Sequence, residues 1–544
     1  MQADFLRILD QLAASLPESP ILLLSALAAG ADQLAAVWAL EWSGRQPRLS
    51  DGSSRLMLGV PLPLPADEYR RDFADDSASL ALFEDLLSRA AFRTTVPAAA
   101  NDDGSRDAAY SRLASFLAEQ SQTLVAFWDG QRVLRRGGTY HVIEKCRRSD
   151  PEAAQLDVPF HRRRHLLMAP NEVDLRLILV KRTGAAAASP PSSEQETRPM
   201  TEELWPDAAD YRARLDAMNG RLARQEVTSP FYSTSDRVRA RFEAIDAMAS
   251  AVKRDFLRHV KSITLLALVA AACFQVFSFS SRDGWAAFAY VGITLIVFAW
   301  YFAVRHFSGV EWAFVYSRGV AEAMRVQLVW SSSGIVDRVA EQYMSRRSME
   351  VAALRRLVAA ATVETLSDDA ASGAAEMSGD AAAQWIEGQL SYMRRRLVDG
   401  NRGRSIADRI SSSAISVVRL IVRAQWLIIL MTVAALAWAT IQPNSGEPRA
   451  LVDRWMPIGA LFIGVLVFLK SGVEYHDNAM LGREDRRRFQ RLVPVYDKAA
   501  ELLARSPSAD DRRRVIVALG KEAIDENAEW FEAHSDALQL PTVG

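Results

Sequence analysis

The chain has 544 residues, a formal charge of −1 and a mean hydropathy of −0.03, averages that by themselves resemble those of a soluble enzyme. That length allows roughly three or four domains. Two cysteines exclude a disulfide framework, and seven scattered histidines provide no pair at metal-ligand spacing, so no metal site is predicted.

Residues 1–182 alternate between strand-like and helix-like patterns. The apolar runs with the length of buried strands lie at 21–25, 56–60, 123–128 and 174–180. Helical patterns separate them, with clear examples at 79–90 and 107–120. This alternation predicts a Rossmann-like α/β domain, in which a parallel sheet carries helices on both faces.

Two loops of small residues follow strands of this predicted sheet. Small residues let a phosphate approach backbone N–H groups at the start of a helix, where the helix dipole favours an anion. Parallel strands end at one edge of the sheet, so we expect both loops to face one crevice. The alternative is a tight turn and a surface loop with no ligand. The predicted nucleotide-binding residues are Ser25, Gly30, Ala31, Asp32, Asp129, Gly130, Gly137, Gly138 and Thr139.

The remainder of the chain is predicted to be helical. After a linker at 183–232, helical units are expected at 233–365 and 384–540, joined by a polar loop at 366–383. Each unit contains two apolar runs without internal charge, and at ~1.5 Å per residue the longer runs match the hydrocarbon core of a bilayer. These runs lie at about 261–280, 285–304, 424–441 and 456–472. They predict an all-α membrane region with four transmembrane helices arranged as two hairpins.

Basic residues predict the orientation of these hairpins. Lys and Arg cluster outside the hairpins, whereas the two short turns hold only Arg282, Arg449 and Arg454. Both termini are therefore expected in the cytoplasm, with the chain passing several times through a membrane. Four helices leave no lumen, so a pore would require a homo-oligomer.

Other chemistry has weaker signals. The acids Asp32, Glu68, Asp72 and Asp129 lie near predicted strand ends, but acid–base catalysis needs two of them to converge on a substrate, so no catalytic residue is predicted. Asp32 could instead stabilise the start of a helix. Basic runs such as 394–396 lack interleaved aromatic residues, so solvent or anionic lipid is expected around them rather than nucleic acid.

The first loop carries a family resemblance. SALAAGADQLAA, at 25–36, resembles the S-x-L-A-x-G-x-D-x-x-A signature of the SLOG superfamily, which joins the DNA-processing protein A and the LOG cytokinin-activating proteins. The segments at 60–73, 124–130 and 137–139 fit the same pattern, so the resemblance covers about residues 15–180. It implies a nucleotide-sensing domain. SLOG domains begin with a glycine-bearing strand, whereas this chain starts at the following helix, so the domain is expected to lack its first strand.

The C-terminal half resembles SLATT domains, the two-span membrane effectors associated with SLOG domains. The matching segment at 519–530 is preceded by these residues: Tyr316, Arg318, Ala321, Glu322, Arg325, Gln327, Trp330, Gly334 and Tyr343. Together the resemblances imply a bacterial anti-phage effector that senses a nucleotide-derived ligand and permeabilises the inner membrane in which it lies. LOG hydrolases place a Glu where this chain has Val142, with Glu144 two residues further on, so a binder is expected. The alternatives are a membrane-anchored nucleotide hydrolase or glycosidase and a passive scaffold.

Overall fold

The computed structural model describes the following residues, together with single positions between 292 and 300: 1–96, 104–156, 173–180, 200–202, 208–223, 234–279, 309–335, 337–342, 349–363, 380–402, 482–506 and 508–538. The chain divides into two compact units. The first comprises Met1–Met248, Gly319–Ser378 and Gly520–Ala528. The second comprises Ala249–Arg318, Gly379–Leu519 and Glu529–Gly544.

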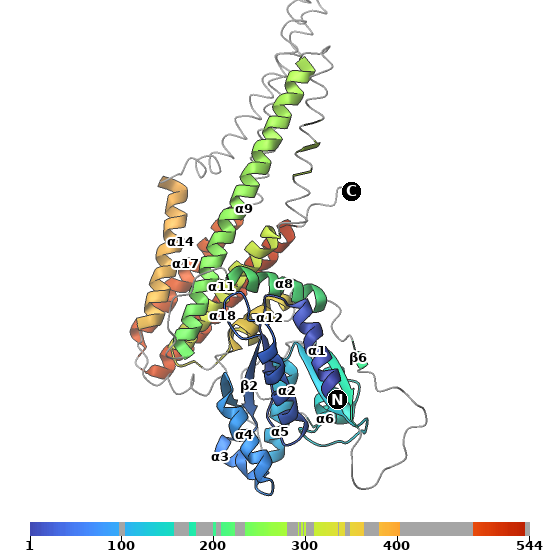
Figure 1. The fold of residues 1–544 in the computed structure, drawn as a ribbon. Coiled ribbons are helices and arrows are strands. Elements are labelled where there is room, and N and C mark those ends of the chain that lie inside the picture. The colour runs from blue at the N-terminus through green and yellow to red at the C-terminus, as the bar shows by residue number, and fades with distance from the viewer. Residues whose placement is uncertain are drawn as a thin grey trace, which may run out of the picture. The chain divides into compact units, whose positions relative to one another are not determined.

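The N-terminal region of the first unit contains two three-stranded sheets (Figure 1). Their strands are β1 (Ile21–Leu24), β2 (Leu56–Leu62), β3 (Phe92–Thr95), β4 (Thr123–Trp128), β5 (Asp174–Leu179) and β6 (Met200–Glu202). In the first sheet β1, β2 and β3 are parallel and lie in that order. In the second, β4 and β5 are parallel and β6 is antiparallel to β5.

The prediction of an α/β region with parallel strands is therefore confirmed. Two strands, β3 and β6, lie outside the predicted set. Both are short, polar and at a sheet edge, so neither has the apolar run by which a buried strand is recognised.

Helices cover both faces of these strands. They are α1 (Gln2–Ser15), α2 (Ala31–Arg45), α3 (Ala66–Tyr69), η1 (Arg70–Phe73), α4 (Ser77–Ser88), α5 (Arg106–Gln120), α6 (Thr139–Arg147), α7 (Pro151–Ala154) and α8 (Ala208–Leu222). Leu23 and Val125 pack in the cluster of α1 and α2, whereas Leu24 packs with α5 and Leu124 with α6. Because neighbouring residues of a strand point to opposite faces, these helix pairs lie on opposite faces.

Helix α8 lies at the amino ends of the strands. Its Asp216 accepts hydrogen bonds from the Glu18 backbone N–H and the Ser19 hydroxyl, both at 2.8 Å. Tyr211 accepts one from Gln122, just before β4. The stretch 183–232, expected to be a linker, thus includes a helix packed on the sheet domain. The carboxyl ends of β1, β2 and β4 lie at the other edge.

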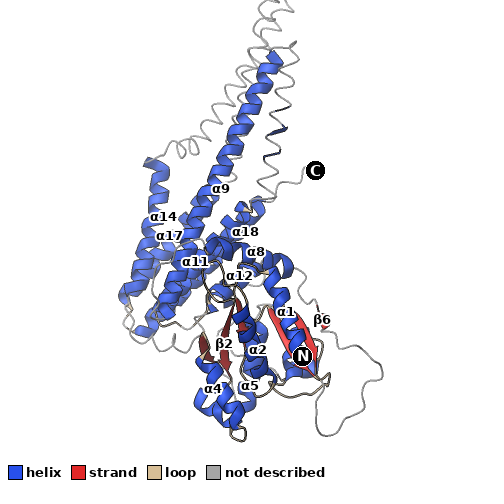
Figure 2. Cartoon of the chain, viewed as in Figure 1, coloured by secondary structure: helices blue, strands red, loops and turns tan. Residues whose placement is uncertain are grey.

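All described elements after β6 are helical (Figure 2). Beyond α8 they are α9 (Thr234–Phe279), α11 (Val310–Ser332), η2 (Val339–Glu341), α12 (Met349–Ala361), α14 (Asp380–Arg402), α17 (Gly482–Arg505) and α18 (Ala509–Leu538). In the second unit, α14 packs along α17 through Trp385 and Tyr496, whose ring centroids are 5.6 Å apart. An ion pair between Arg394 and Asp497 borders this contact.

The predicted four-helix membrane region is wrong for the part of the chain that the structure describes. None of the described helices is both long enough and apolar enough to cross a bilayer. For α14 and α17 the physical reason is charge, since these helices bury aromatic faces against each other while exposing arginines. Helix α9 begins with a charged amphipathic stretch well before 261–280, and nearly all side chains of its run 261–279 lie outside the described ones. The runs at 424–441 and 456–472, and most of 285–304, lie outside the described residues.

Candidate functional site

The first glycine loop, residues 25–30, joins β1 to α2 and is held by the core. Leu27 is fully buried although its φ is +58°, in the left-handed region that leucine rarely adopts. The Leu27 N–H donates to the Ser25 hydroxyl oxygen at 3.2 Å. Gly30, with a φ of +98°, then turns the chain into α2. Packing of a strained residue thus sets the shape of this loop.

The helices after the two glycine loops begin without side-chain caps. Gly30 precedes α2 and Gly138 precedes α6, and neither helix has a side-chain hydrogen bond from its cap residue to the backbone N–H groups of its first turn. By contrast, Asp76, Ser105 and Asp150 cap the backbone N–H groups of α4, α5 and α7. The first turns of α2 and α6 therefore present backbone donors at the positive end of a helix dipole.

The second glycine loop, residues 129–138, ends in a close backbone contact. Gly137 has a φ of +70°, and a Cβ there would lie 2.8 Å from the backbone carbonyl of Tyr110 on α5. The Gly137 N–H donates to Nδ1 of the buried His141 at 3.0 Å. Glycine is needed at this position for both space and backbone conformation.

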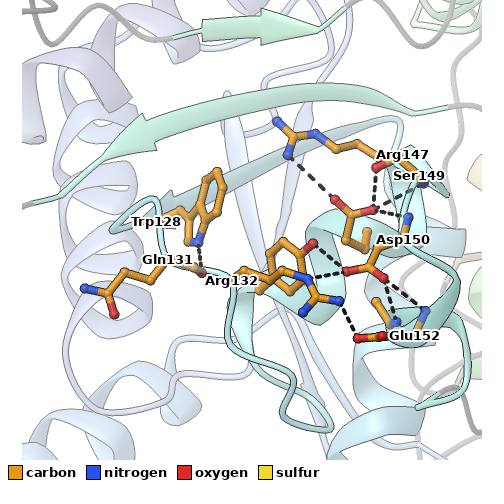
Figure 3. Close-up of polar contacts among 10 residues, drawn as sticks. Trp128, Gln131, Arg132, Arg147, Ser149, Asp150 and Glu152 are labelled. Carbon is orange, nitrogen blue, oxygen red and sulfur yellow. Dashed lines mark hydrogen bonds and ion pairs between the residues drawn. The ribbon is translucent and has the colours of Figure 1, made fainter. Parts of the chain in front are cut away.

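Ion pairs and hydrogen bonds hold the rest of the second loop (Figure 3). Arg132 Nε donates to Asp150 at 2.8 Å, and its terminal nitrogen donates to Glu152 at 2.6 Å. The Tyr140 hydroxyl donates to the same Asp150 carboxylate at 2.8 Å. The pKa of Asp150 is lowered by the hydrogen bond from Arg132, then by that from Tyr140. At the loop tip, Val133 and Leu134 are exposed.

A cluster of polar side chains connects the two loops. Tyr110, whose backbone meets Gly137, donates its hydroxyl to Asp72. Its ring lies 6.4 Å from that of the buried Tyr69. Burial raises the pKa of Tyr69 most, and the phenol of Tyr110 and the carboxylates of Asp32 and Asp72 raise it further. Asp32, in the first turn of α2 after the first loop, and Gly137 of the second loop are therefore both next to this cluster.

A positively charged side chain, that of Arg106, borders this cluster at the edge of the glycine loops. Arg106, the first residue of α5, donates to Asp72 and, at 3.2 Å, to Glu68. Its side chain is 43% exposed, so a ligand can reach it. An arginine is unfavourable at a helix N-terminus because its charge opposes the dipole, and the two carboxylates offset this.

Asp32 is partly buried at the first turn of α2. Burial raises the pKa of its carboxyl to about 6, although the hydrogen bond from the Ala28 backbone N–H acts in the opposite direction. The side chain thus folds back onto the first loop. Its carboxyl is partly protonated near neutral pH.

The other predicted residues have local roles. Asp129 accepts the Gln131 N–H at 3.1 Å and Gly130 has a φ of +81°, so this pair forms a turn. Ala31 and Thr139 are the first residues of α2 and α6. Glu144, the acid nearest the hydrolase position, is buried and accepts from the Ser149 N–H and hydroxyl and from the Asp150 N–H.

Sequence reasoning did not single out Tyr69, Arg106 or Tyr110. The sequence could have indicated Arg106, because it directly precedes the predicted helix at 107–120. That helix begins on the side of the domain where the parallel strands end. No sequence feature indicates the two tyrosines, because their proximity depends on how α5 packs against the segment after β2.

Among the described residues, no group of three His, Cys, Asp or Glu side chains is arranged to hold a metal ion. A small cavity of about 100 Å³ lies away from the glycine loops, lined by Ile8, Gln11, Leu12, Ser15, Arg176 and Arg212. Comparison with family models, curated proteins and solved structures found no match for this chain.

Proposed function

We propose that the α/β region binds a phosphorylated, nucleotide-type ligand at the carboxyl ends of β1 and β4 and acts as a sensor. The observation that carries this proposal is the pair of uncapped helix N-termini, α2 after Gly30 and α6 after Gly138, connected by the cluster of Tyr69, Tyr110 and Asp72. Backbone donors at a helix N-terminus suit a phosphate.

Side chains of the same cluster complement the rest of such a ligand. Arg106 would exchange a carboxylate partner for a phosphate oxygen, to which a guanidinium can donate two hydrogen bonds. The carboxylate released, that of Glu68 or Asp72, is an acceptor suited to a ribose hydroxyl group. A phosphate group without a ribose would use the donors of this site but not its carboxylate acceptors.

Binding is favoured over hydrolysis. Val142 stands where the hydrolase pattern has an acid, and the Glu144 carboxylate is hydrogen-bonded to Ser149 and Asp150 in the loop before α7. The carboxylates that do face the cluster, Asp32 and Asp72, are each engaged: Asp32 by the Ala28 N–H, and Asp72 by Arg106 and Tyr110. Each of these two carboxylates therefore already has hydrogen-bond partners within the cluster or the first loop.

Helix α5 offers a route for the signal within the first unit. Arg106 and Tyr110 lie at its ligand end, and Gln120 is its last residue. The Gln120 amide oxygen accepts a 2.6 Å hydrogen bond from the buried Arg338, which also donates to the Ala359 carbonyl oxygen at 3.0 Å. A shift of α5 on ligand binding would therefore reach η2 and α12. The expected action at a bacterial inner membrane and the expected self-association stay predictions.

Thr139→Pro tests the ligand site. Proline is well tolerated as the first residue of a helix but removes one backbone donor, and Gly138 already has the extended conformation that precedes proline. The partner variant Thr139→Ala keeps that donor and removes only the hydroxyl. Titration calorimetry of the full chain with AMP, ADP-ribose and a cyclic dinucleotide should show at least one ligand whose affinity falls about tenfold in Thr139→Pro relative to Thr139→Ala, the loss expected for one charge-assisted hydrogen bond.

Two controls accompany this experiment. Arg106→Gln should weaken the same ligand, whereas Arg45→Gln, at the far end of α2, should not. Chromatography of the ligand after incubation reports any turnover. No binding by any nucleotide, or equal affinities of the two Thr139 variants, would contradict the proposal, and released base or phosphate would favour the hydrolase.

The route through α5 has a separate readout. Ligand should change hydrogen exchange in α12, and Gln120→Ala should abolish that change while leaving affinity within about twofold, because Gln120 lies 14 residues along α5 from Arg106. An unaltered response in Gln120→Ala would exclude this route.

A further inference from the structure

The small cavity away from the glycine loops has a composition of its own. Helices α1 and α8 lie side by side in the first unit, and both contribute to its lining (Figure 1). Helix α1 provides Ile8, Gln11, Leu12 and Ser15, whose spacing places them on one face of the helix. Ile8 is buried, whereas Gln11 and Ser15 are exposed. The cavity thus has an apolar inner end and a polar rim.

Two arginines complete the lining. Arg176 belongs to β5 and points to the same side of the strand as Ile178, which packs in one cluster with Ile8 of α1. Arg212 belongs to α8. Their side chains are only 21% and 18% exposed. Both guanidinium groups are therefore held inside the domain and border the cavity, rather than extending into solvent.

One carboxylate positions both arginines. Oδ2 of Asp174 accepts from Nη2 of Arg176 at 3.0 Å and from Nη1 of Arg212 at 3.2 Å. Asp174 is buried and is not among the residues that line the cavity. The lining itself contains two positive side chains and no negative one. A cavity of this composition favours an anion.

Helix α8 holds Arg212 in place from both directions along the chain. Tyr211 accepts a hydrogen bond from Gln122 at 2.9 Å, and Asp216 accepts one from the Ser19 hydroxyl at 2.8 Å. The helix is therefore attached to the sheet domain on either side of Arg212. Because the arginine is ordered in advance, less conformational entropy is lost when a ligand binds to it.

The two arginines are not required to neutralise the negative end of α1. The Leu12 carbonyl oxygen accepts from the Ser15 hydroxyl at 2.9 Å. The carbonyl oxygens of Ala13 and Leu16 both accept from Arg55, at 2.6 Å. The positive charge that the end of this helix dipole favours is therefore supplied by Arg55.

Size and polarity together define the class of ligand. A cavity of about 150 Å³ holds one benzene ring, so one of about 100 Å³ holds a short carbon chain but no nucleotide. A guanidinium can donate two parallel hydrogen bonds to a carboxylate. Ile8 and Leu12 have no polar group to offer, so an ion with oxygens on every side, such as phosphate, would bury some of them without partners.

We propose that this cavity binds a short-chain organic acid. Its carboxylate lies against Arg176 and Arg212, and its carbon chain lies against Ile8 and Leu12. The site is separate from the glycine loops, and it rests on none of the observations that support nucleotide binding.

The first test compares small molecules on the full chain. Ligand-detected NMR titration should show that butyrate binds at least about tenfold more tightly than butyramide, which has the same shape without the charge. Acetate and inorganic phosphate, added as competitors, should displace butyrate severalfold less well than unlabelled butyrate displaces a labelled sample. Absence of butyrate binding, or equal affinity for butyramide, would overturn the proposal. Equal competition by phosphate would overturn the organic acid as the ligand.

The second test removes one arginine. Arg212→Gln should weaken butyrate binding about tenfold, the loss expected for a charge-assisted hydrogen bond. Arg214→Gln is the matched control, because Arg214 lies two residues along α8, pairs with Asp210 at 2.6 Å and does not line the cavity. Circular dichroism checks that both variants are folded. Equal butyrate affinities of the two variants would overturn the proposal.

The third test leaves both arginines in place. Ser15 is exposed at the rim, so its replacement does not disturb the core. Ser15→Glu brings a negative charge to the rim and should weaken butyrate binding severalfold relative to Ser15→Gln, which has the same size and no charge. Equal affinities would mean that butyrate binds elsewhere. Thr139→Pro should leave butyrate binding unchanged, and a loss there would place butyrate at the glycine loops and overturn the proposal.

Discussion

The two glycine loops have the same place in the topology but are held by different forces. The first is anchored by Leu27, which is fully buried, and by Ala26, which is almost fully buried, so core packing sets its shape. The second has an exposed tip and depends on Arg132 with Asp150 and Glu152, and on the contact of Gly137 with Tyr110. Packing is short-ranged and insensitive to salt, whereas exposed ion pairs are screened. The first loop is therefore a fixed part of the site and the second an adjustable one.

Gly137→Val should cause the largest loss of stability. Its side chain would meet the Tyr110 backbone and force a β-branched residue to a φ of +70°, so the free energy of unfolding should fall by about 3–5 kcal/mol. Urea denaturation measures it. A loss below about 1 kcal/mol would mean that the second loop moves away from α5 easily.

Leu27→Ala should cost about 3 kcal/mol, because it opens a cavity in the core. Leu27→Gly should be no worse, since glycine relieves the left-handed strain of about 1 kcal/mol. The control is Leu58, equally buried on β2, where glycine should be about 1 kcal/mol worse than alanine. The same penalty at both positions would refute strain at Leu27.

Asp32→Asn should stabilise the protein at mildly alkaline pH by about 1–2 kcal/mol. The carboxyl has a folded-state pKa of about 6 against an ordinary 3.8, so its contribution to stability is fully present below about pH 4 and is lost as pH rises through 6. Urea unfolding of both proteins between about pH 4 and 8 should show a difference that vanishes at the acidic end. Asp107→Asn, at the same helix position but exposed, should show no such trend.

Arg132→Gln should have the smallest effect on global stability, because the Arg132 side chain is itself half-exposed and its partner Glu152 lies at the surface. Its effect should be local: amides of residues 129–138 exchange severalfold faster, and raising the salt concentration does the same to the unmodified chain. Arg135→Gln, in the same loop but outside the network with Asp150 and Glu152, is the matched control. If hydrogen exchange of residues 129–138 did not depend on salt, the second loop would not be held by exposed ion pairs, and the comparison between the loops would be wrong.

Much of the α/β region followed from local pattern. The strands around 21–25, 56–60, 123–128 and 174–180 are recognisable because buried parallel strands are short and apolar, and both glycine loops lie where these strands end. Glycines 30 and 137 do have positive φ values, as a tight approach requires. The helical half was different: apolar runs predicted membrane helices, but none of the described helices is both long enough and apolar enough to cross a bilayer.

Residue order alone determined the alternation of strand and helix and the small residues at two helix starts, because these depend on side-chain size and period along the chain. Tertiary structure alone decided that Tyr69, Tyr110 and Arg106 meet beside the loops, that Glu144 supports a turn, and that Arg212 meets Asp174. Each of these depends on groups distant in sequence being brought together by packing, which no local pattern encodes.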